Sequence, residues 1–466
     1  MLKRDMLRNE KQITEKLLQQ FHSFFSREEN YSRQGHIWRI QTALGTIDLL
    51  NWLQQQNFEI KTYWSGRDHR FAMAGVGSVH DVSGDFPIAF PALFAQMQNV
   101  LTASHPELRF YGGIRFDSSQ PPSAEWQQFS TFRFIIPKFE IFHDGVQSWF
   151  ACNFTVPSKE NSQRFLKELQ SEIERLKFKW ASSQELPDCK SRRDFPDWQE
   201  WKNNVVRALD LFKDQGLQKI VLARKSVLQF SQAIDPVSLF KILSTTSPHS
   251  FHFCFQRNSR SAFLGITPER LYRRDNSDVF SEAVAGTRLR GSDERMDRIL
   301  GDELLQSEKD LREHRWVSDM VKSSIEPFCD SISILAKEQL LKLPNVQHLH
   351  TLFNGHLSNG VSDGEILARL HPTPAVGGFP RDESMSYIAE MEPFDRGWYA
   401  GPVGWVSNKA SEFAVAIRSA LVFGNSLSLF AGSGIVQGSN PKKEWEENEN
   451  KILNFTKLFK TDDASC

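Results

Sequence analysis

The sequence predicts an α+β fold in which large layers of antiparallel β-sheet are covered by helices. Segments 131–145 and 148–156 alternate apolar and polar residues in part, as half-buried antiparallel strands do. Two apolar segments late in the chain, 411–423 and 426–436, are separated by a short Gly-Asn turn typical of a hairpin. Helical segments interrupt these strands, and sheets covered by helices follow from that combination.

The first 195 residues read as helix, then several short strands, then a second helix. An amphipathic opening helix ends near FHSFFSREE, and strands are expected over 71–86, 131–145 and 148–156. A helix with leucines near helical spacing is expected over 158–179. The polar, proline-bearing segment 181–197 marks a boundary. We therefore divide the chain into an N-terminal α/β half (1–195), a second region (196–458) and a C-terminal tail (459–466).

The second region opens with Asp197 as a helix N-cap and Gly216 just beyond the helix end. A helix over about 296–325 is unusually long for a connection between strands. The hairpin of 411–423 and 426–436 completes this region. Four further strands are expected, at 219–230, 251–256, 262–266 and 269–274.

Composition excludes several classes of function. The chain has 56 basic and 57 acidic residues, a net charge of -1, so it lacks the excess positive charge of a nucleic-acid-binding protein. None of the five cysteines forms a C-x-x-C pair, which argues against a zinc site. No segment reaches the ~20 apolar residues that span a membrane. The N-terminus carries charges throughout and has no signal-peptide core. These features predict a cytoplasmic protein without a membrane or nucleic-acid partner.

The C-terminal segment 431–451, AGSGIVQGSNPKKEWEENENK, places three charged residues on one helix face. Glu444, Glu447 and Lys451 fall at i, i+3 and i+7, directly after glycines that expose backbone N–H groups. One interpretation is a solvated, charged helix. The other is a site for a metal ion and an anionic substrate. Glu313, in the expected helix 296–325, could supply a second carboxylate to a shared Mg²⁺ site, since Mg²⁺ takes few protein ligands.

Two further residues are candidates for proton transfer. Lys219 starts an otherwise apolar strand; it is either a surface lysine at a strand edge or a general base whose pKa burial lowers. Glu269 follows a proline turn, and a carboxyl group in an enclosed site can stay protonated and act as an acid.

Four more features suit a binding site, although each has a structural explanation. Gly286 permits close approach of a ligand or a tight turn. The loop 370–380, LHPTPAVGGFP, is rigid and irregular. Arg418 is a lone cation in an apolar segment and needs an anion if buried, either a substrate carboxylate or an aspartate of the protein. His348 is equally compatible with a hydrogen-bonded core position.

Seven ordered motifs together resemble the chorismate-utilising enzymes. This family includes isochorismate synthase, salicylate synthase, anthranilate synthase component I and aminodeoxychorismate synthase. The motifs cover about residues 216–458, and the N-terminal half resembles such proteins only loosely. They are KIVLAR, TPERL, AVAGTRLRG, SEKDLREH, HPTPAVGGFP, EMEPFDRGWYAGPVGW and AGSGIVQGSNPKKEWEENENK. The resemblance implies the anthranilate synthase component I type of fold and makes 196–458 the catalytic region.

The resemblance also implies roles for individual residues. Lys219 matches a base that activates water, and Glu269 matches an acid that protonates the departing hydroxyl. Glu313 and Glu447 match ligands of Mg²⁺, and Asp310 and Glu444 match acidic positions that hold its waters. The positions expected to contact substrate are Gly286, Thr287, His348, Ala375, Arg418, Gly432 and Lys451.

Within the family, the sequence is most similar to isochorismate synthases. Ala285 and Ala375 differ from the residues usual in the other branches. The implied reaction is Mg²⁺-dependent isomerisation of chorismate to isochorismate, feeding menaquinone biosynthesis, in a monomer or homodimer without a glutaminase subunit. The alternatives are salicylate synthase, isochorismate supply for a siderophore, and an inactive homologue that acts as a binding subunit.

Overall fold

The structure, a computed structural model, describes residues 2–68, 70–101, 105–178, 185–214, 216–342 and 346–459. Within these residues the strands form two sheets, of twelve and nine strands. The pairings given for both sheets are antiparallel, as the sequence predicts. The α+β prediction is therefore confirmed.

The strand order of the larger sheet mixes early and late parts of the chain. In spatial order its strands are β1 (Ile37–Leu44), β8 (Ser148–Thr155), β7 (Phe139–His143), β3 (Ala72–Val76), β2 (Lys61–Ser65), β11 (Phe251–Asn258), β12 (Ser261–Thr267), β20 (Ser419–Phe423), β21 (Ser426–Ile435), β10 (Lys219–Phe230) and β17 (Gly378–Phe379), and β9 (Cys189–Phe195) pairs with β10. The nine-stranded sheet runs β15 (Cys329–Lys342), β16 (Val346–Leu357), β14 (Asp278–Leu289), β13 (Arg270–Asp275), β19 (Ala410–Val415), β18 (Pro402–Val406), β5 (Phe110–Ile114), β6 (Phe132–Ile136) and β4 (His80–Gly84).

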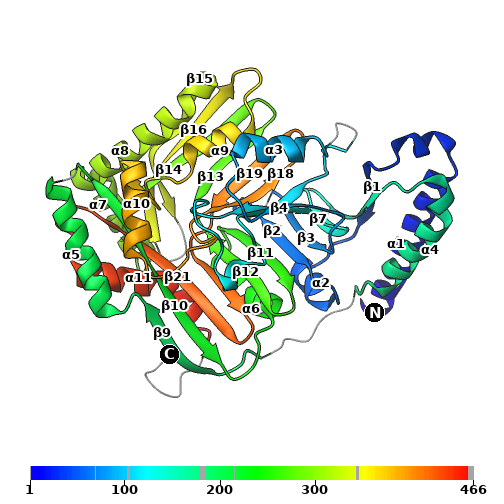
Figure 1. Cartoon of the computed structure of the whole chain (residues 1–466), viewed down its shortest axis with the longest axis horizontal. Coiled ribbons are helices and arrows are strands. Elements are labelled where there is room, and N and C mark those ends of the chain that lie inside the picture. The colour runs from blue at the N-terminus through cyan, green and yellow to red at the C-terminus, as the bar shows by residue number, and fades with distance from the viewer. Residues whose placement is uncertain are drawn as a thin grey trace.

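Helices lie around the two sheets (Figure 1). Those nearest the candidate site are α8, beside β14 and β16, and α11, beside β21. At the opposite end of the molecule α1 and α4 lie together beyond β1 (Figure 1). The helix bounds are α1 (Leu2–Phe25), α2 (Leu49–Gln55), α3 (Phe90–Gln98), α4 (Ser162–Arg175), α5 (Trp198–Asp214), α6 (Pro236–Ser244), α7 (Glu294–Gln306), α8 (Glu308–Ile325), α9 (Asp363–Leu370), α10 (Arg381–Met391) and α11 (Pro441–Thr456).

Both sheets combine strands from the two sides of the predicted boundary at residue 195. In the larger sheet β2 pairs with β11, and in the smaller sheet β5 pairs with β18. The segment 181–197 itself contains β9, which pairs with β10. Phe459, at the start of the predicted tail, packs against Phe230 with ring centroids 4.6 Å apart. The rest of the tail lies outside the described residues.

Two chain segments pass side by side from one sheet to the other. One connects β12 to β13 through Pro268 and Glu269, and the other connects β19 to β20 through Arg418. Ile266 N donates to Arg418 O at 3.1 Å, and Val415 N donates to Glu269 O at 3.1 Å. Backbone hydrogen bonds therefore join these two connections between the sheets, which we call the crossings. Arg418 has a φ of 51° at this bend. The single strand expected over 411–423 is thus wrong, because the left-handed backbone at Arg418 divides it between two sheets.

The long helix expected over 296–325 is also divided. Ser307 separates α7 from α8, and its side chain accepts a hydrogen bond from Asp310 N at 3.3 Å. Ser307 is therefore the N-cap of α8, so a second helix begins here although the helical pattern of the sequence continues without a break. By contrast, the predicted start at Asp197 is confirmed: its carboxylate accepts from Glu200 N at 2.9 Å, and Gly216 has a φ of 68°.

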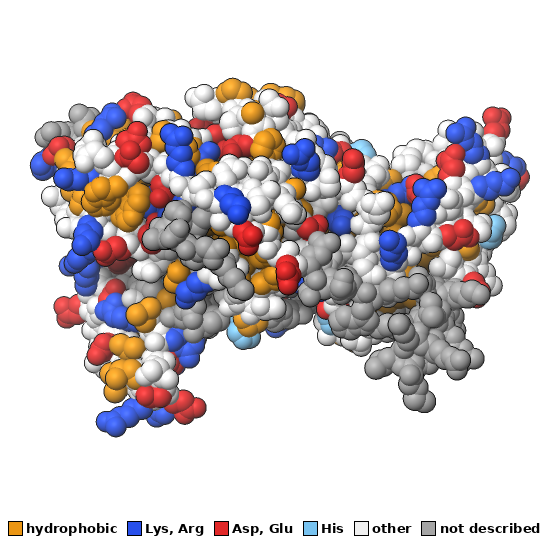
Figure 2. All heavy atoms as spheres, turned by 90° about the horizontal axis from the view of Figure 1, so that it is seen from below, with side chains coloured by type: hydrophobic (Ala, Val, Ile, Leu, Met, Phe, Trp, Pro, Cys, Tyr) orange, Lys and Arg blue, Asp and Glu red, His pale blue; other side chains and the backbone are white. Residues whose placement is uncertain are grey.

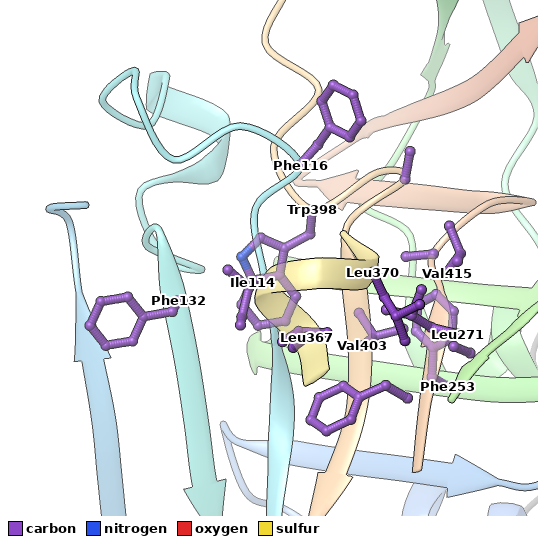
Figure 3. Close-up of a cluster of buried hydrophobic side chains, with 14 of the residues drawn as sticks. Ile114, Phe116, Phe132, Phe253, Leu271, Leu367, Leu370, Trp398, Val403 and Val415 are labelled. Carbon is purple, nitrogen blue, oxygen red and sulfur yellow. The ribbon is translucent and has the colours of Figure 1, made fainter. Parts of the chain in front are cut away.

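Apolar side chains from both sheets and from α9 form a buried core between them (Figure 3). Leu367 and Leu370 of α9 lie near Val403 of β18 and Leu271 of β13 (Figure 3). A second core lies on the other face of the larger sheet, beneath helices such as α1, α4 and α6. Burial on two sides fixes the sheets rigidly, which is what a site built at their junction requires.

The surface carries mixed charges. In the view from below, basic and acidic side chains are interspersed and hydrophobic side chains occur in small groups (Figure 2). Among the described residues, no helix is both long and apolar enough to cross a membrane.

Candidate active site

Lys219 is the first residue of β10 and is half-buried. It pairs with Phe379 of the short strand β17, which comes from the loop predicted to be rigid. Burial lowers the pKa of the Lys219 amine, while the carboxylates of Glu313, Glu269 and Glu447 oppose that shift. The lysine therefore faces three carboxyl groups from three separate elements, and it is not an isolated surface lysine.

Glu269 occupies one of the crossings between the sheets. Burial and the negative charge of Glu282 raise the pKa of Glu269 to about 7, and Lys219 and Lys451 lower it. A carboxyl group with this pKa is substantially protonated near neutral pH and can give up a proton. Lys219 and Glu269 thus lie close enough for the charge of each to shift the pKa of the other.

Two helices bring the remaining carboxylates to Lys219. Glu313 lies on α8 and Glu447 on α11, and both are exposed. Glu447 accepts a hydrogen bond from Lys451 one turn later. Burial raises the pKa of Glu444, and Glu447 adds to that effect. This face of α11 thus carries Glu447 close enough to Lys219 for their charges to interact, and Glu444 and Lys451 on the same face are half-buried.

Two cations, Lys451 of α11 and Arg418 between β19 and β20, lie near these carboxylates. Lys451 Nζ donates to Gly432 O of β21 at 2.7 Å, which brings the predicted glycine and lysine together. Burial lowers the pKa of Lys451 and of Arg418. Within the described part of the chain, no carboxylate lies within 4.0 Å of the Arg418 guanidinium to form an ion pair. A half-buried cation in this state suits an anionic ligand.

Gly286, Thr287 and His348 meet where β14 and β16 pair. His348 Nδ1 lies 3.3 Å from Gly286 O and 3.0 Å from Thr287 Oγ1. Burial, together with the positive charges of Arg418 and Lys451, lowers the pKa of His348 to about 4, although its hydrogen bond to Gly286 opposes the shift; the imidazole is therefore neutral at physiological pH. Nδ1 carries the proton if it donates to the Gly286 carbonyl, which leaves Nε2 as an acceptor.

Asp310 and Ala375 are tied less closely to the other candidates. Asp310 lies beside Gly286, but its carboxylate forms an ion pair with Arg288 and accepts a hydrogen bond from Arg288 Nη2 at 2.8 Å. Ala375 is exposed on the loop before β17. That loop is anchored to β10, because Val221 N donates to Gly377 O at 2.9 Å. The roles expected for Asp310 and Ala375 stay predictions.

Gly434 is a site residue that the sequence analysis missed. A Cβ atom at Gly434 would lie 2.9 Å from Lys219 Cε, so only glycine leaves room for the lysine side chain in its present position. Gly434 lies two residues after Gly432 on β21, on the same face of the strand. That two-residue spacing in AGSGIV was the available signal.

The donor groups suit magnesium. Among the described residues, no three His, Cys, Asp or Glu side chains gather as a preformed metal cage. Magnesium does not need one, because it binds one or two carboxylates together with waters and substrate oxygens. Glu313 and Glu447 are hard oxygen donors from separate helices beside Lys219, and this set fits Mg²⁺.

Comparison with known proteins identifies the family. The profile of a family described as "Chorismate binding enzyme" matches residues 19–460. The chain belongs to the chorismate-binding enzymes. This membership covers both halves of the molecule, including the strands before residue 195.

Similar family members share one activity in their names. Isochorismate synthase MenF of Haemophilus influenzae is 30% identical, with 98% of this chain and 99% of that protein covered. Chloroplastic isochorismate synthase of Catharanthus roseus is 34% identical, over 84% of this chain and 68% of that protein. The structure of the menaquinone-specific isochorismate synthase MenF from Escherichia coli superposes with a TM-score of 0.83 at 28% identity, over 96% of this chain and 99% of that one.

Proposed function

We propose that the protein is an isochorismate synthase, an isomerase that converts chorismate to isochorismate. The observation that carries this proposal is the similarity to isochorismate synthase MenF over 98% of the chain. The proximity of a lysine with a lowered pKa to a glutamic acid with a pKa of about 7 supports it, because the reaction needs one base and one acid.

In the proposed reaction, Lys219 takes a proton from water as the water oxygen bonds to C2 of chorismate. Both ring double bonds shift by one position, and the C4–O bond breaks. Glu269 donates its proton to the departing hydroxyl, which leaves as water. One water enters and one leaves, so the reaction is an isomerisation. The lowered pKa of Lys219 increases the fraction of neutral amine able to act as a base.

Glu313 and Glu447 would hold Mg²⁺, and Asp310 and Glu444 would hold its waters. Bound Mg²⁺ would supply positive charge to the substrate carboxylate and fix its position. Chorismate is a dianion with two carboxylates, and Arg418 and Lys451 would supply a cation for each. The other residues assigned to substrate contact are Gly286, Thr287, His348, Ala375 and Gly432.

The proposal extends to the biological setting. The names of the MenF relatives favour menaquinone biosynthesis over a siderophore or salicylate pathway. We also propose that the enzyme is a monomer or a homodimer, that it needs no glutaminase subunit and that it works in the cytoplasm.

Product analysis tests the proposal. Purified protein is incubated with chorismate and Mg²⁺, and the products are separated by chromatography. Isochorismate as the sole product is expected. Salicylate with pyruvate would identify a salicylate synthase, anthranilate formed with ammonium salts would identify the amide-transfer branch, and no turnover would identify an inactive homologue.

The metal assignment has its own test. Glu447→Gln removes one anionic ligand, so the Mg²⁺ concentration that gives half-maximal rate should rise. Glu446→Gln, at an exposed neighbouring position on the same helix, is the control and should leave it unchanged. An unchanged Mg²⁺ requirement in Glu447→Gln would contradict the assignment.

A further inference from the structure

An ion pair between buried Glu282 and half-buried Arg67 holds the backbone around Glu269. Glu282 of β14 has a side chain with 0% exposure, and the Arg67 guanidinium binds it with both nitrogens, Nη1 to Oε1 at 2.8 Å and Nη2 to Oε2 at 2.7 Å. A planar guanidinium bound in this way fixes the carboxylate in orientation as well as in position.

Both members of this pair also hold the chain on either side of Glu269. Arg67 Nη1 donates to Pro268 O at 2.9 Å, and Glu282 Oε1 accepts from Arg270 N at 3.2 Å. The residues before and after Glu269 are therefore each tied to one partner of the same ion pair. His350 Nε2 lies 2.9 Å from Glu282 Oε2 and completes the surroundings of the carboxylate.

Arg67 lies between β2 and β3, far from the other site residues in sequence. The N-terminal half thus reaches the crossing on which Glu269 stands. We propose that Arg67 and Glu282 are positioning residues for Glu269, holding its backbone and presenting a fixed negative charge behind it. This inference rests on the proposed function, in which Glu269 is the proton donor.

The charges around Glu269 make the inference measurable. Glu282 of β14 favours the protonated form of Glu269, while Lys219 of β10 and Lys451 of α11 favour the ionised form. Burial opposes ionisation of Glu282, but Arg67 and His350 outweigh it and hold the pKa of Glu282 below its ordinary range. Glu282 therefore stays negative throughout the pH range in which Glu269 titrates.

The test is the pH profile of kcat/KM for isochorismate formation by the full-length protein. In Glu282→Gln, the negative charge behind Glu269 is lost and Arg67 is left unneutralised. The pKa of Glu269 should fall, and the fall in activity at high pH should begin about one pH unit lower than in the unmodified enzyme.

Glu412→Gln is the matched control. Glu412 is similarly buried and pairs with Arg270 at 3.0 Å, so its loss disturbs a neighbouring ion pair without removing charge that acts on Glu269. Its high-pH limb should stay in place. A profile of Glu282→Gln that coincides with that of Glu412→Gln would overturn the proposal.

Arg67→Lys covers the case in which Glu282→Gln does not fold. Lysine keeps the positive charge but cannot bind both carboxylate oxygens and Pro268 O together. A several-fold loss of kcat with little change in the KM for chorismate is expected, and an unchanged kcat would contradict the inference. Failure of the unmodified protein to form isochorismate would instead contradict the proposed function.

Discussion

Glu269 and Glu282 are two carboxyl groups in the same buried region that end in opposite protonation states. Glu282 contacts Arg67 and His350 and stays ionised. Burial and the negative charge of Glu282 oppose ionisation of Glu269 and raise its pKa to about 7. Such a difference between neighbouring groups separates an acid from a fixed charge without any difference in residue type.

Replacement of the proposed base tests its role most simply. Lys219→Ala removes the amine that accepts the proton from water, so kcat should fall by ~10²–10⁴-fold while chorismate binding changes little. Steady-state kinetics and equilibrium binding of chorismate measure the two effects. A loss of less than about tenfold would rule out general-base catalysis by this lysine.

The raised pKa of Glu269 predicts a dependence of stability on pH. The folded state holds the proton up to about pH 7, whereas the unfolded chain loses it near 4.5. Stability from this group is therefore present below 4.5 and is lost as pH rises through 7. Glutamine does not titrate, so Glu269→Gln should gain stability relative to the unmodified protein by about 1–3 kcal/mol over this range.

Urea unfolding at several pH values measures this difference. The free energies of unfolding are compared between Glu269→Gln and the unmodified protein. A difference that is constant with pH would show that Glu269 titrates normally.

At the level of residues, motifs in the sequence pointed to the candidate site but not to the residues that support it. KIVLAR, TPERL and the C-terminal segment pointed to Lys219, Glu269 and Glu447, which the structure brings together. Arg67 and Glu282 were missed, because buried charge pairs form between segments distant in sequence and neither partner has a local pattern. Gly434 was missed although its spacing from Gly432 was visible.

At the level of elements, the site depends on interruptions in regular structure. Arg418 and Glu269 lie where strands leave one sheet for the other, and Ser307 starts α8, which carries Glu313. The hydrophobic periodicity of the sequence continues without interruption through the predicted strand 411–423 and the predicted helix 296–325, both of which the structure divides. It predicted their secondary structure but could not predict a change of direction that tertiary packing determines.

Gly434 links strand geometry to activity. In Gly434→Ala, the new methyl group would displace the flexible end of Lys219, so kcat should fall at least about tenfold. Overall stability should change little, because a side-chain end can move. Gly45→Ala, where a Cβ meets nothing within 4 Å, is the control. Full activity in Gly434→Ala would show that the position of Lys219 is not constrained by β21.

At the level of the whole molecule, the two halves of the chain share both sheets. The polar, proline-bearing segment 181–197 suggested a boundary at residue 195, but strand pairing across that boundary is long-range and leaves no local signal. N-terminal strands such as β2 and β5 lie inside the sheets, so the first half is part of the framework that holds the site.

Expression of residues 196–466 alone tests this interdependence. Loss of β2 and β5 would expose the edges of β11 and β18 and uncover apolar side chains of the shared core. The fragment should aggregate or unfold without a cooperative transition, as thermal circular dichroism would reveal. A cooperatively folded fragment would instead support two independent domains.

The central claim is that this site adds water to chorismate as it expels a hydroxyl group. The most direct measurement is the reaction of chorismate and Mg²⁺ in water labelled with heavy oxygen, followed by mass spectrometry of the product. We expect isochorismate that carries one heavy oxygen, at C2. Isochorismate without the label, or a product other than isochorismate, would contradict the account.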